Sequence, residues 1–393
     1  MSSLFDRVRS IDAFRAVTMF LMIFVNDLDG VPKVPVWLKH AGGNVDGMGV
    51  ADTIFPAFLF IVGLSIPFAF QNREKAAGQK MIFRIIARSA ALMLIGFYHA
   101  NMETYNETAA ALPRPVWESL ITFSFFFLFL DYRHTSKIKK YLLQGVGALL
   151  LAILSAYYVS TDAGHHWLHF TWWGILGLIG WSYLVCGLIY YFSRGNLLVQ
   201  AVAWVFFMFL NIDFHLGWLD FMYNWRADVW IAGNGAMQAF TMAGIVIAVL
   251  YRYSVEKSEI KTFWLALFLL ILILLNLAFI VRYTAGGISK EHDTPSWVFI
   301  CTAISMGVYG IFVFVTDIKQ KYQWFNIIKP AGTNTFTCYI LPFMFYPLYQ
   351  MTNLGYPAYL SQGTGGLIKC ILFSFIMIWL VGLLEKVNIK LKI

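Results

Sequence analysis

A polar, glycine-rich stretch before the second long apolar run carries residue types suited to proton transfer. It holds one histidine, His40, and two acids, Asp46 and Asp52. Histidine titrates near neutral pH and is the commonest general base. Asp52 stands just before the apolar run 55–70, so at the head of a helix it can hold the imidazole tautomer or cap the helix. His40 is therefore a candidate base, and the alternative is an ordinary solvated loop histidine.

Three more polar residues lie in the first apolar run. Asp12 and Arg15 are three residues apart, so they share one helix face. Ionisable groups at membrane depth are costly, so this pair is either a structural ion pair or part of a site. Asn26 ends the same run, where it can cap the helix or hydrogen-bond a substrate or an oxyanion.

These residues belong to a string of short motifs. S-x-D-x-F-R covers residues 10–15, F-V-N ends at Asn26, K-H-A contains His40, and G-x-A-D-x-x-F-P covers residues 49–56. The string resembles the heparan-α-glucosaminide N-acetyltransferase family of transmembrane acyltransferases and its bacterial relatives. The resemblance adds Asn26 to His40 and Asp52 as predicted catalytic residues.

The resemblance is not uniform along the chain. It is specific over residues 10–67 and weaker over 329–350, where a G-x-N segment precedes a late helix. The middle of the chain is similar only as apolar helices. Two features differ from the family: Ala16 stands where the family usually has glycine, and the loop between His40 and Asp52 is slightly longer.

The resemblance implies a reaction and two substrates. A membrane-embedded acyltransferase of this kind would move an acetyl group from cytoplasmic acetyl-coenzyme A to an extracytoplasmic acceptor, an amino sugar or another glycan. His40 would act as general base or would carry the acetyl group itself. Acetyl-coenzyme A is the acyl-donor substrate, and we expect no metal.

Basic residues after the second apolar run suit the phosphates of the donor. Arg84 and Arg88 are four residues apart on one predicted helix face, an arrangement suited to a phosphate clamp. The alternative is plain anchoring of the helix end. We predict that the donor is bound by Asp12, Arg15, Arg84, Arg88 and Asn334.

Other polar residues are candidates for the acceptor site. Glu118 is a carboxylate inside an apolar run. Trp225 belongs to a segment rich in aromatic and polar residues, which suits a sugar ring or an interfacial aromatic belt. We predict that the acceptor is bound by Asp46, Glu118, Trp225 and His292.

Composition indicates a membrane protein. Hydrophobic residues make up 59% of the chain and charged residues 13%, about half the share in soluble domains, and the mean hydropathy is +0.66. Backbone groups in lipid must be satisfied internally, which favours helices. We predict an all-α, polytopic helical bundle of 11–12 spans in one domain, 1–393. The expected spans are 10–28, 51–70, 82–99, 115–131, 141–159, 172–192, 197–213, 236–252, 262–281, 296–316, 331–350 and 364–384. The eleventh carries Pro342 and Pro347 and is a candidate broken or re-entrant helix.

The distribution of basic residues predicts the topology. Most of the 29 lysines and arginines fall on one side of the predicted spans. The positive-inside rule then places both termini in the cytoplasm and His40 on the outer face. The resemblance to the bacterial relatives implies the inner membrane of a bacterium. The net charge of +8 is thus a topological bias, and nucleic acid is not expected as a partner.

Two further expectations concern association and function class. The small residues Gly174, Gly177 and Gly180 permit close helix contacts, and a homodimer is one arrangement they allow. A multi-span sugar transporter is the alternative function, because twelve spans with cytoplasmic ends are common there. Transporters often show internal repeats and charges at mid-membrane, whereas this chain concentrates its polar motif at the outer edge.

Overall fold

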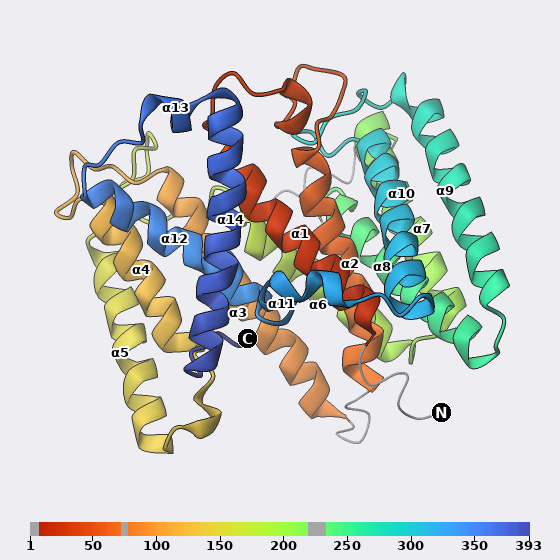
Figure 1. Cartoon of the computed structure of the whole chain (residues 1–393), viewed down its shortest axis with the longest axis horizontal. Coiled ribbons are helices and arrows are strands. Elements are labelled where there is room, and N and C mark those ends of the chain that lie inside the picture. Colours follow the sequence, from red (N-terminus) through yellow and green to blue (C-terminus); the bar gives the residue numbers. More distant parts are fainter. Residues whose placement is uncertain (1–7, 72–77, 219–232) are drawn as a thin grey trace.

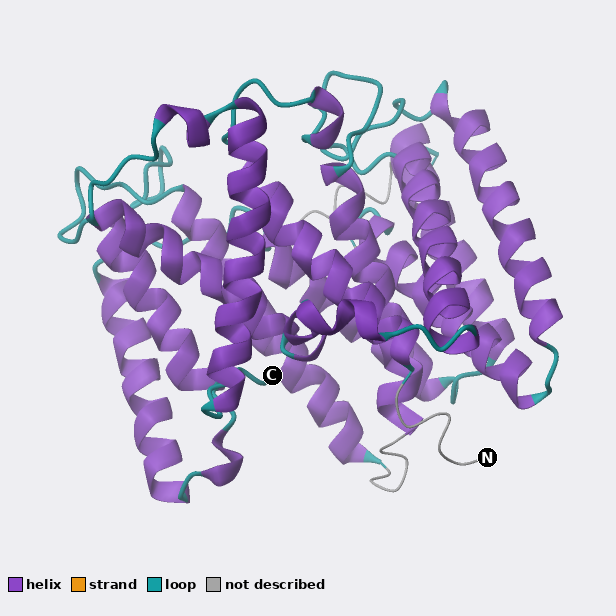
Figure 2. Cartoon of the chain, viewed as in Figure 1, coloured by secondary structure: helices purple, strands orange, loops and turns teal. Residues whose placement is uncertain are grey.

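The chain folds into an all-α bundle, as the sequence predicts. We describe it in a computed structural model covering residues 8–71, 78–218 and 233–393. Within these residues the regular structure is helical, with no strand beyond isolated bridges (Figures 1 and 2).

Every predicted span is helical, and only the eleventh is divided between two α-helices. The first half of the chain contains α1 (Arg9–Leu28), α2 (Ala51–Gln71), α3 (Gln79–Glu103), α4 (Arg114–Phe129), α5 (Lys137–Ala156), α6 (Gly174–Phe192) and α7 (Leu197–Leu216). The second half contains α8 (Ala236–Glu256), α9 (Ile260–Arg282), α10 (Pro295–Phe312), α11 (Lys329–Thr333), α12 (Thr335–Met351), α13 (Ala358–Ser361) and α14 (Gly363–Lys386). Short helical turns lie at Val36–Leu38, Tyr132–His134, Val313–Ile318 and Gln323–Ile327.

Nine helices in the described part of the chain are long and apolar enough to cross a membrane. The helices α1, α4 and α12 fall outside this set: α4 and α12 have only 16 and 17 residues, and α1 carries polar groups. The protein is an integral membrane protein, since helices of this length and hydropathy match the hydrocarbon core of a bilayer.

Burial separates central from peripheral helices. In α8, 83% of the apolar, membrane-spanning stretch is buried inside the protein, compared with 17% in α9 and 22% in α5. The centre is tightly packed because α2 and α8 meet at glycines: a Cβ on Gly63 would lie 1.9 Å from the carbonyl oxygen of Thr241. The α2 helix, which begins beside the candidate histidine, is thus held against the most buried helix of the fold.

The eleventh predicted span is divided, but not at its prolines. The break is at Asn334, between α11 and α12, whereas Pro342 and Pro347 lie inside α12. Close packing accounts for this position. A Cβ on Gly332 would lie 2.6 Å from the carbonyl oxygen of Asp12 in α1, so the chain passes against α1 at this glycine before it turns.

Two loops meet at one end of the bundle. The segment between α1 and α2 lies at the upper edge, close to the segment between α9 and α10, while α1 begins toward the lower side (Figure 1). The amide of Gly47 donates a hydrogen bond of 3.0 Å to the carbonyl of Ile288, which joins the two loops directly. This junction surrounds His40.

Candidate active site

His40 is positioned by a loop that folds back on the start of α2. The amide of Val50 donates to the carbonyl of Trp37 at 2.8 Å, which closes the loop. Gly49 passes so near the carbonyl of Lys39 that a Cβ would lie 1.9 Å from that oxygen. Only glycine fits this crossing, so the loop carries His40 back to the head of α2.

The carboxylate of Asp52 contacts the imidazole of His40, as the sequence predicted. Its Oδ1 lies 2.6 Å from His40 Nδ1, and the carboxylate is 1% exposed. Its Oδ2 accepts hydrogen bonds from the amides of Ala41 and Gly49 at 3.0 and 2.9 Å. A carboxylate accepts only, so Nδ1 carries the proton and Nε2 keeps its lone pair. This is the tautomer that a general base requires.

A lysine missed by sequence reasoning completes the contacts of the imidazole. The Nζ atom of Lys290 lies 3.2 Å from His40 Nδ1 and 3.5 Å from Nε2. Lys290 comes from the loop between α9 and α10, 250 residues away in sequence. No local motif marks this lysine, so only the packing of the two loops reveals it. Burial lowers the pKa of Lys290, while the nearby Asp52, Asp29, Asp293 and Glu291 act in the opposite direction.

The loop carrying Lys290 is held in place by Asp46. The amide of Ile288 donates to Asp46 Oδ1 at 2.7 Å, and Arg282 Nε lies 3.0 Å from Asp46 Oδ2. The Ile288 hydrogen bond, followed by Arg282, lowers the pKa of Asp46. Asp46 was predicted as an acceptor ligand, and the contacts described here are those of a clamp between the two loops.

The carboxyl group of Asp293, on the same loop, makes the stability of the folded protein depend on pH. Burial raises the pKa of Asp293 to about 6, above the ordinary value of about 3.9 in an unfolded chain. The folded state therefore binds more protons between these values, and this residue contributes a loss of stability as pH rises from about 4 to 6.

We expect Asp293→Asn to remove that loss and to stabilise the protein above pH 6 by up to about 3 kcal/mol. Asp293 has a positive φ of 51°, which asparagine tolerates well, and the amide oxygen can still accept from Asn234. The check is the unfolding temperature of both proteins in detergent from pH 4.5 to 7.5. Parallel curves would contradict it.

His40 opens on a cavity of about 310 Å³ at its end of the bundle. Asn26 and Asp29, at the end of α1, share this cavity with His40, and Asn26 is exposed to it. The opposite wall is apolar and aromatic and includes Phe343 and Tyr339 of α12. The predicted juxtaposition of Asn26 and His40 is therefore present in the fold.

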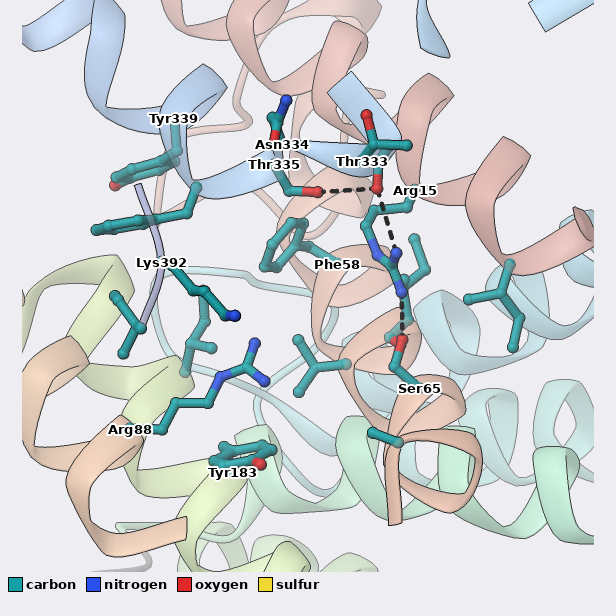
Figure 3. Close-up of a pocket in the computed structure, with 18 of the residues that line it drawn as sticks. Arg15, Phe58, Ser65, Arg88, Tyr183, Thr333, Asn334, Thr335, Tyr339 and Lys392 are labelled. Carbon is teal, nitrogen blue, oxygen red and sulfur yellow. Dashed lines mark hydrogen bonds between the residues drawn. The ribbon is translucent and has the colours of Figure 1, made fainter. Parts of the chain in front are cut away.

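A second cavity of about 460 Å³ lies toward the opposite end of α1 and α2, beside the start of α1 and the end of α2. Its lining includes Asp12 and Arg15, where Arg15 donates to Asp12 at 3.3 Å, to the Gly332 carbonyl at 3.2 Å and to Ser65 Oγ at 2.5 Å. Figure 3 shows Arg15 extending along α2 to Ser65. The ion pair predicted from spacing thus forms and also lines a cavity.

Three further cations, from two other segments, line this second cavity. Arg88 of α3 and Lys392, near the end of the chain, extend into the same space (Figure 3). The Arg88 guanidinium also lies 4.9 Å from the ring centre of Tyr183. Lys390 lines the cavity too, and its Nζ donates to the Thr333 carbonyl at 3.2 Å. Sequence reasoning did not select the two lysines.

Asn334 lies in the wall of the second cavity, as predicted. Its side chain is 3% exposed, and its Oδ1 has no hydrogen-bond partner among the described residues. Buried polar atoms are nearly always paired, so an unpaired acceptor in a cavity wall suits a donor on a bound molecule.

Tyr339 belongs to both cavities. It lines the second cavity together with Asn334 and the first cavity together with His40. Its ring packs with Phe343 at 5.5 Å and with buried His99 at 6.2 Å between centroids. One aromatic side chain therefore stands where the two cavities adjoin.

The remaining predicted residues lie elsewhere. Arg84 is exposed and is not part of the cavity that Arg88 lines. Glu118 pairs with Arg114 at 2.7 Å in α4. His292 follows Lys290 in the same loop, and its carbonyl accepts from His215 Nε2 at 2.9 Å. Trp225 lies outside the described residues.

A known protein family matches the part of the chain that contains His40 and Asp52. A family model described as a domain of unknown function, DUF5009, matches residues 7–242, which is more than half of the chain. The chain belongs to this family. The match includes α1, α2 and the loop that carries His40, so the histidine–aspartate pair of this DUF5009 protein lies inside the family region.

Curated relatives confirm the resemblance predicted from the motifs. The DUF5009 protein is 36% identical over 104 residues to the human heparan-alpha-glucosaminide N-acetyltransferase, an alignment covering 26% of this chain and 15% of the human protein. It is 35% identical over 99 residues to the mouse protein of the same name, covering 24% and 14% of the two chains. The aligned segment thus spans about a seventh of each curated relative.

Proposed function

We propose that this protein is a membrane acyltransferase that moves an acetyl group from acetyl-coenzyme A to an extracytoplasmic acceptor, an amino sugar or another glycan. The observation that carries the proposal is the shared wall at Tyr339: a histidine–aspartate pair opens on one cavity, and a cation-lined cavity adjoins it. The similarity to two N-acetyltransferases supports the reaction class.

The second cavity, lined by Arg15, Arg88 and Asn334, suits the donor. Arg88, Lys390 and Lys392 offer charge-assisted hydrogen bonds to phosphate oxygens. Asn334 Oδ1 offers an acceptor to the amide of a pantetheine arm. In this arrangement the nucleotide stays at the cytoplasmic end, and the thioester reaches His40 past Tyr339.

The first cavity suits the acceptor and the chemistry. His40 Nε2 removes a proton from the acceptor amine as that nitrogen attacks the thioester carbon. The C–N bond forms, the C–S bond breaks, and the proton passes to the departing thiolate, so the products are an N-acetyl sugar and free coenzyme A. In the alternative role, Nε2 takes the acetyl group first and passes it on. Asp52 stabilises the imidazolium in both cases.

The direct test is thiol release by the purified protein in detergent. Incubation with acetyl-coenzyme A and glucosamine is expected to give equal amounts of free thiol and N-acetylglucosamine. Failure to release thiol with glucosamine, with hydroxyl sugars and with short amino-glycans would contradict the proposal.

The transporter alternative retains one supporting feature. Two cavities that share a wall residue, Tyr339, are also compatible with alternating access. Sealed vesicles containing the protein distinguish the two functions: sugar that accumulates unmodified, without thiol release, favours transport, whereas acetylated sugar with coenzyme A on the opposite side favours the enzyme.

The donor site makes a prediction for Arg88. We expect Arg88→Ala to raise the KM for acetyl-coenzyme A by about tenfold, since one charge-assisted hydrogen bond contributes about 1.5–3 kcal/mol, and to change kcat much less. Arg84→Ala is the matched control, four residues away on the same helix and outside the cavity. Equal effects of the two changes would contradict the assignment.

A further inference from the structure

The contacts of Lys290 extend the proposed function to a third group. We propose that Lys290 is a catalytic residue whose ammonium hydrogen-bonds the oxyanion formed as the acetyl group is transferred at His40. This inference rests on the proposed acyltransferase activity. Nothing in the sequence motifs assigns Lys290, because it enters the site from a loop between two later helices.

Distance is the first step of the argument. Lys290 Nζ is nearly equidistant from the two ring nitrogens, at 3.2 and 3.5 Å, so it lies alongside the part of the imidazole that joins them. Because Nδ1 donates to Asp52, an ammonium hydrogen cannot be accepted there. The ammonium hydrogens are therefore available to an acceptor that reacts beside Nε2.

The position of the developing charge is the second step. If His40 carries the acetyl group, the reacting carbon is bonded to Nε2. If His40 acts as base, the acceptor nitrogen contacts Nε2 and the carbon is bonded to that nitrogen. In both cases the carbonyl oxygen is one bond further on, within a few ångströms of Nε2 and within reach of Nζ. The proposal therefore holds for either role of His40.

The surroundings of the lysine are the third step. Two neighbouring cations have partners elsewhere: Arg282 pairs with Asp46, and Lys39 Nζ donates to the Asp29 carbonyl. Lys290 is partly buried against the imidazole, and placing a cation there costs desolvation. The clamp at Asp46 fixes its loop before substrate arrives, and preorganised charge is what stabilises a transition state.

Charge balance is the fourth step. The groups that face Lys290 are His40 and Asp52 from the start of α2 and its loop, Asp29 after α1, and Glu291 and Asp293 on its own loop. These four carboxylates favour the charged form of the lysine against burial. As a carbonyl oxygen gains negative charge, the ammonium is the donor beside it, with Asn26 on the cavity side.

The test compares Lys290→Met with a matched lysine change. Loss of one oxyanion donor typically lowers kcat by 10²–10³-fold, so we expect Lys290→Met to lose at least about 100-fold in kcat with acetyl-coenzyme A and glucosamine. Lys33→Met, an exposed lysine in the same outer loop region, should stay within about twofold of wild type. A Lys290→Met protein that keeps most of its kcat overturns the proposal.

Two readouts separate charge from mere packing. Ethylammonium chloride should restore part of the activity of Lys290→Ala, because it supplies a cation to the vacated space. Wild-type kcat should fall at alkaline pH as Lys290 loses its proton, and Lys290→Arg, which stays charged, should lack this fall. The same acceptor is used for all variants, so the acceptor's own titration cancels from the comparison.

Each remaining outcome decides between the hypotheses. An inactive Lys290→Ala without rescue, together with an unchanged alkaline limb in Lys290→Arg, would assign Lys290 a structural role and overturn the inference. Acetyl-lysine at position 290 in the active enzyme would overturn it too, since acetylation removes the charge. If Lys290→Met does not fold, the alkaline limb of Lys290→Arg decides. Wild-type protein without thiol release contradicts the acyltransferase itself.

Discussion

Replacing His40 by alanine is expected to lower thiol release from acetyl-coenzyme A by about 10³-fold or more. A positioned general base contributes about 10²–10⁴-fold, and an acyl carrier contributes the entire covalent route. The change removes the side chain that contacts Asp52 and lines the first cavity. The measurement is kcat with saturating acetyl-coenzyme A and glucosamine, together with the unfolding temperature.

A histidine outside the two cavities provides the control. His165 lies in the loop between α5 and α6, where its ring stacks on His169, and His165→Ala should retain wild-type turnover. Full turnover by His40→Ala would eliminate the proposed mechanism. A burst of one thiol per enzyme without acceptor, present in wild type and absent in His40→Ala, would favour the acyl-carrier role over the base.

Changing Asp52 to asparagine should reduce kcat on the order of 10³-fold or more while preserving the shape of the site. The amides of Ala41 and Gly49 both donate to one oxygen of residue 52, so the asparagine oxygen must stay on that side. Its NH₂ group then faces His40 Nδ1, which becomes an acceptor. The ring proton moves to Nε2, and the base loses its lone pair at the reacting atom.

The Asp52→Asn result needs a control variant in which an aspartate outside the two cavities is also replaced by asparagine. Asp162 lies in the loop between α5 and α6, where its side chain is 39% exposed and pairs with His169 at 2.8 Å. Asp162→Asn should cost little activity, because exposed pairs contribute about 0–1 kcal/mol. Unfolding temperatures within a few degrees of wild type would attribute the loss to the tautomer. If Asp52→Asn retains more than a tenth of kcat, the tautomer argument is wrong.

Much of the fold was predictable because its causes are local. Apolar runs of about 20 residues specify membrane helices without reference to distant residues, and each of the predicted spans is helical. The contact between His40 and Asp52 was also predictable, since the two residues are separated by one short loop at the start of α2. The motif string over residues 10–67 likewise needed no structure.

The interruption before α12 was harder to locate. Proline marks a candidate break in any apolar run, so Pro342 and Pro347 suggested one. The structure instead interrupts the helix at Asn334, where Gly332 passes against α1. A close approach between helices depends on which helices are neighbours, and a single sequence does not specify that.

The sequence by itself determined the helices, the membrane class and the histidine–aspartate pair, because each depends on residues close together along the chain. Only the tertiary structure decided that Lys290 reaches His40 from 250 residues away, that Asp46 clamps this loop, and that Tyr339 lines both cavities. These relations depend on the lateral order of the packed helices, and lipid-spanning helices of similar hydropathy carry little local information about which neighbours they choose.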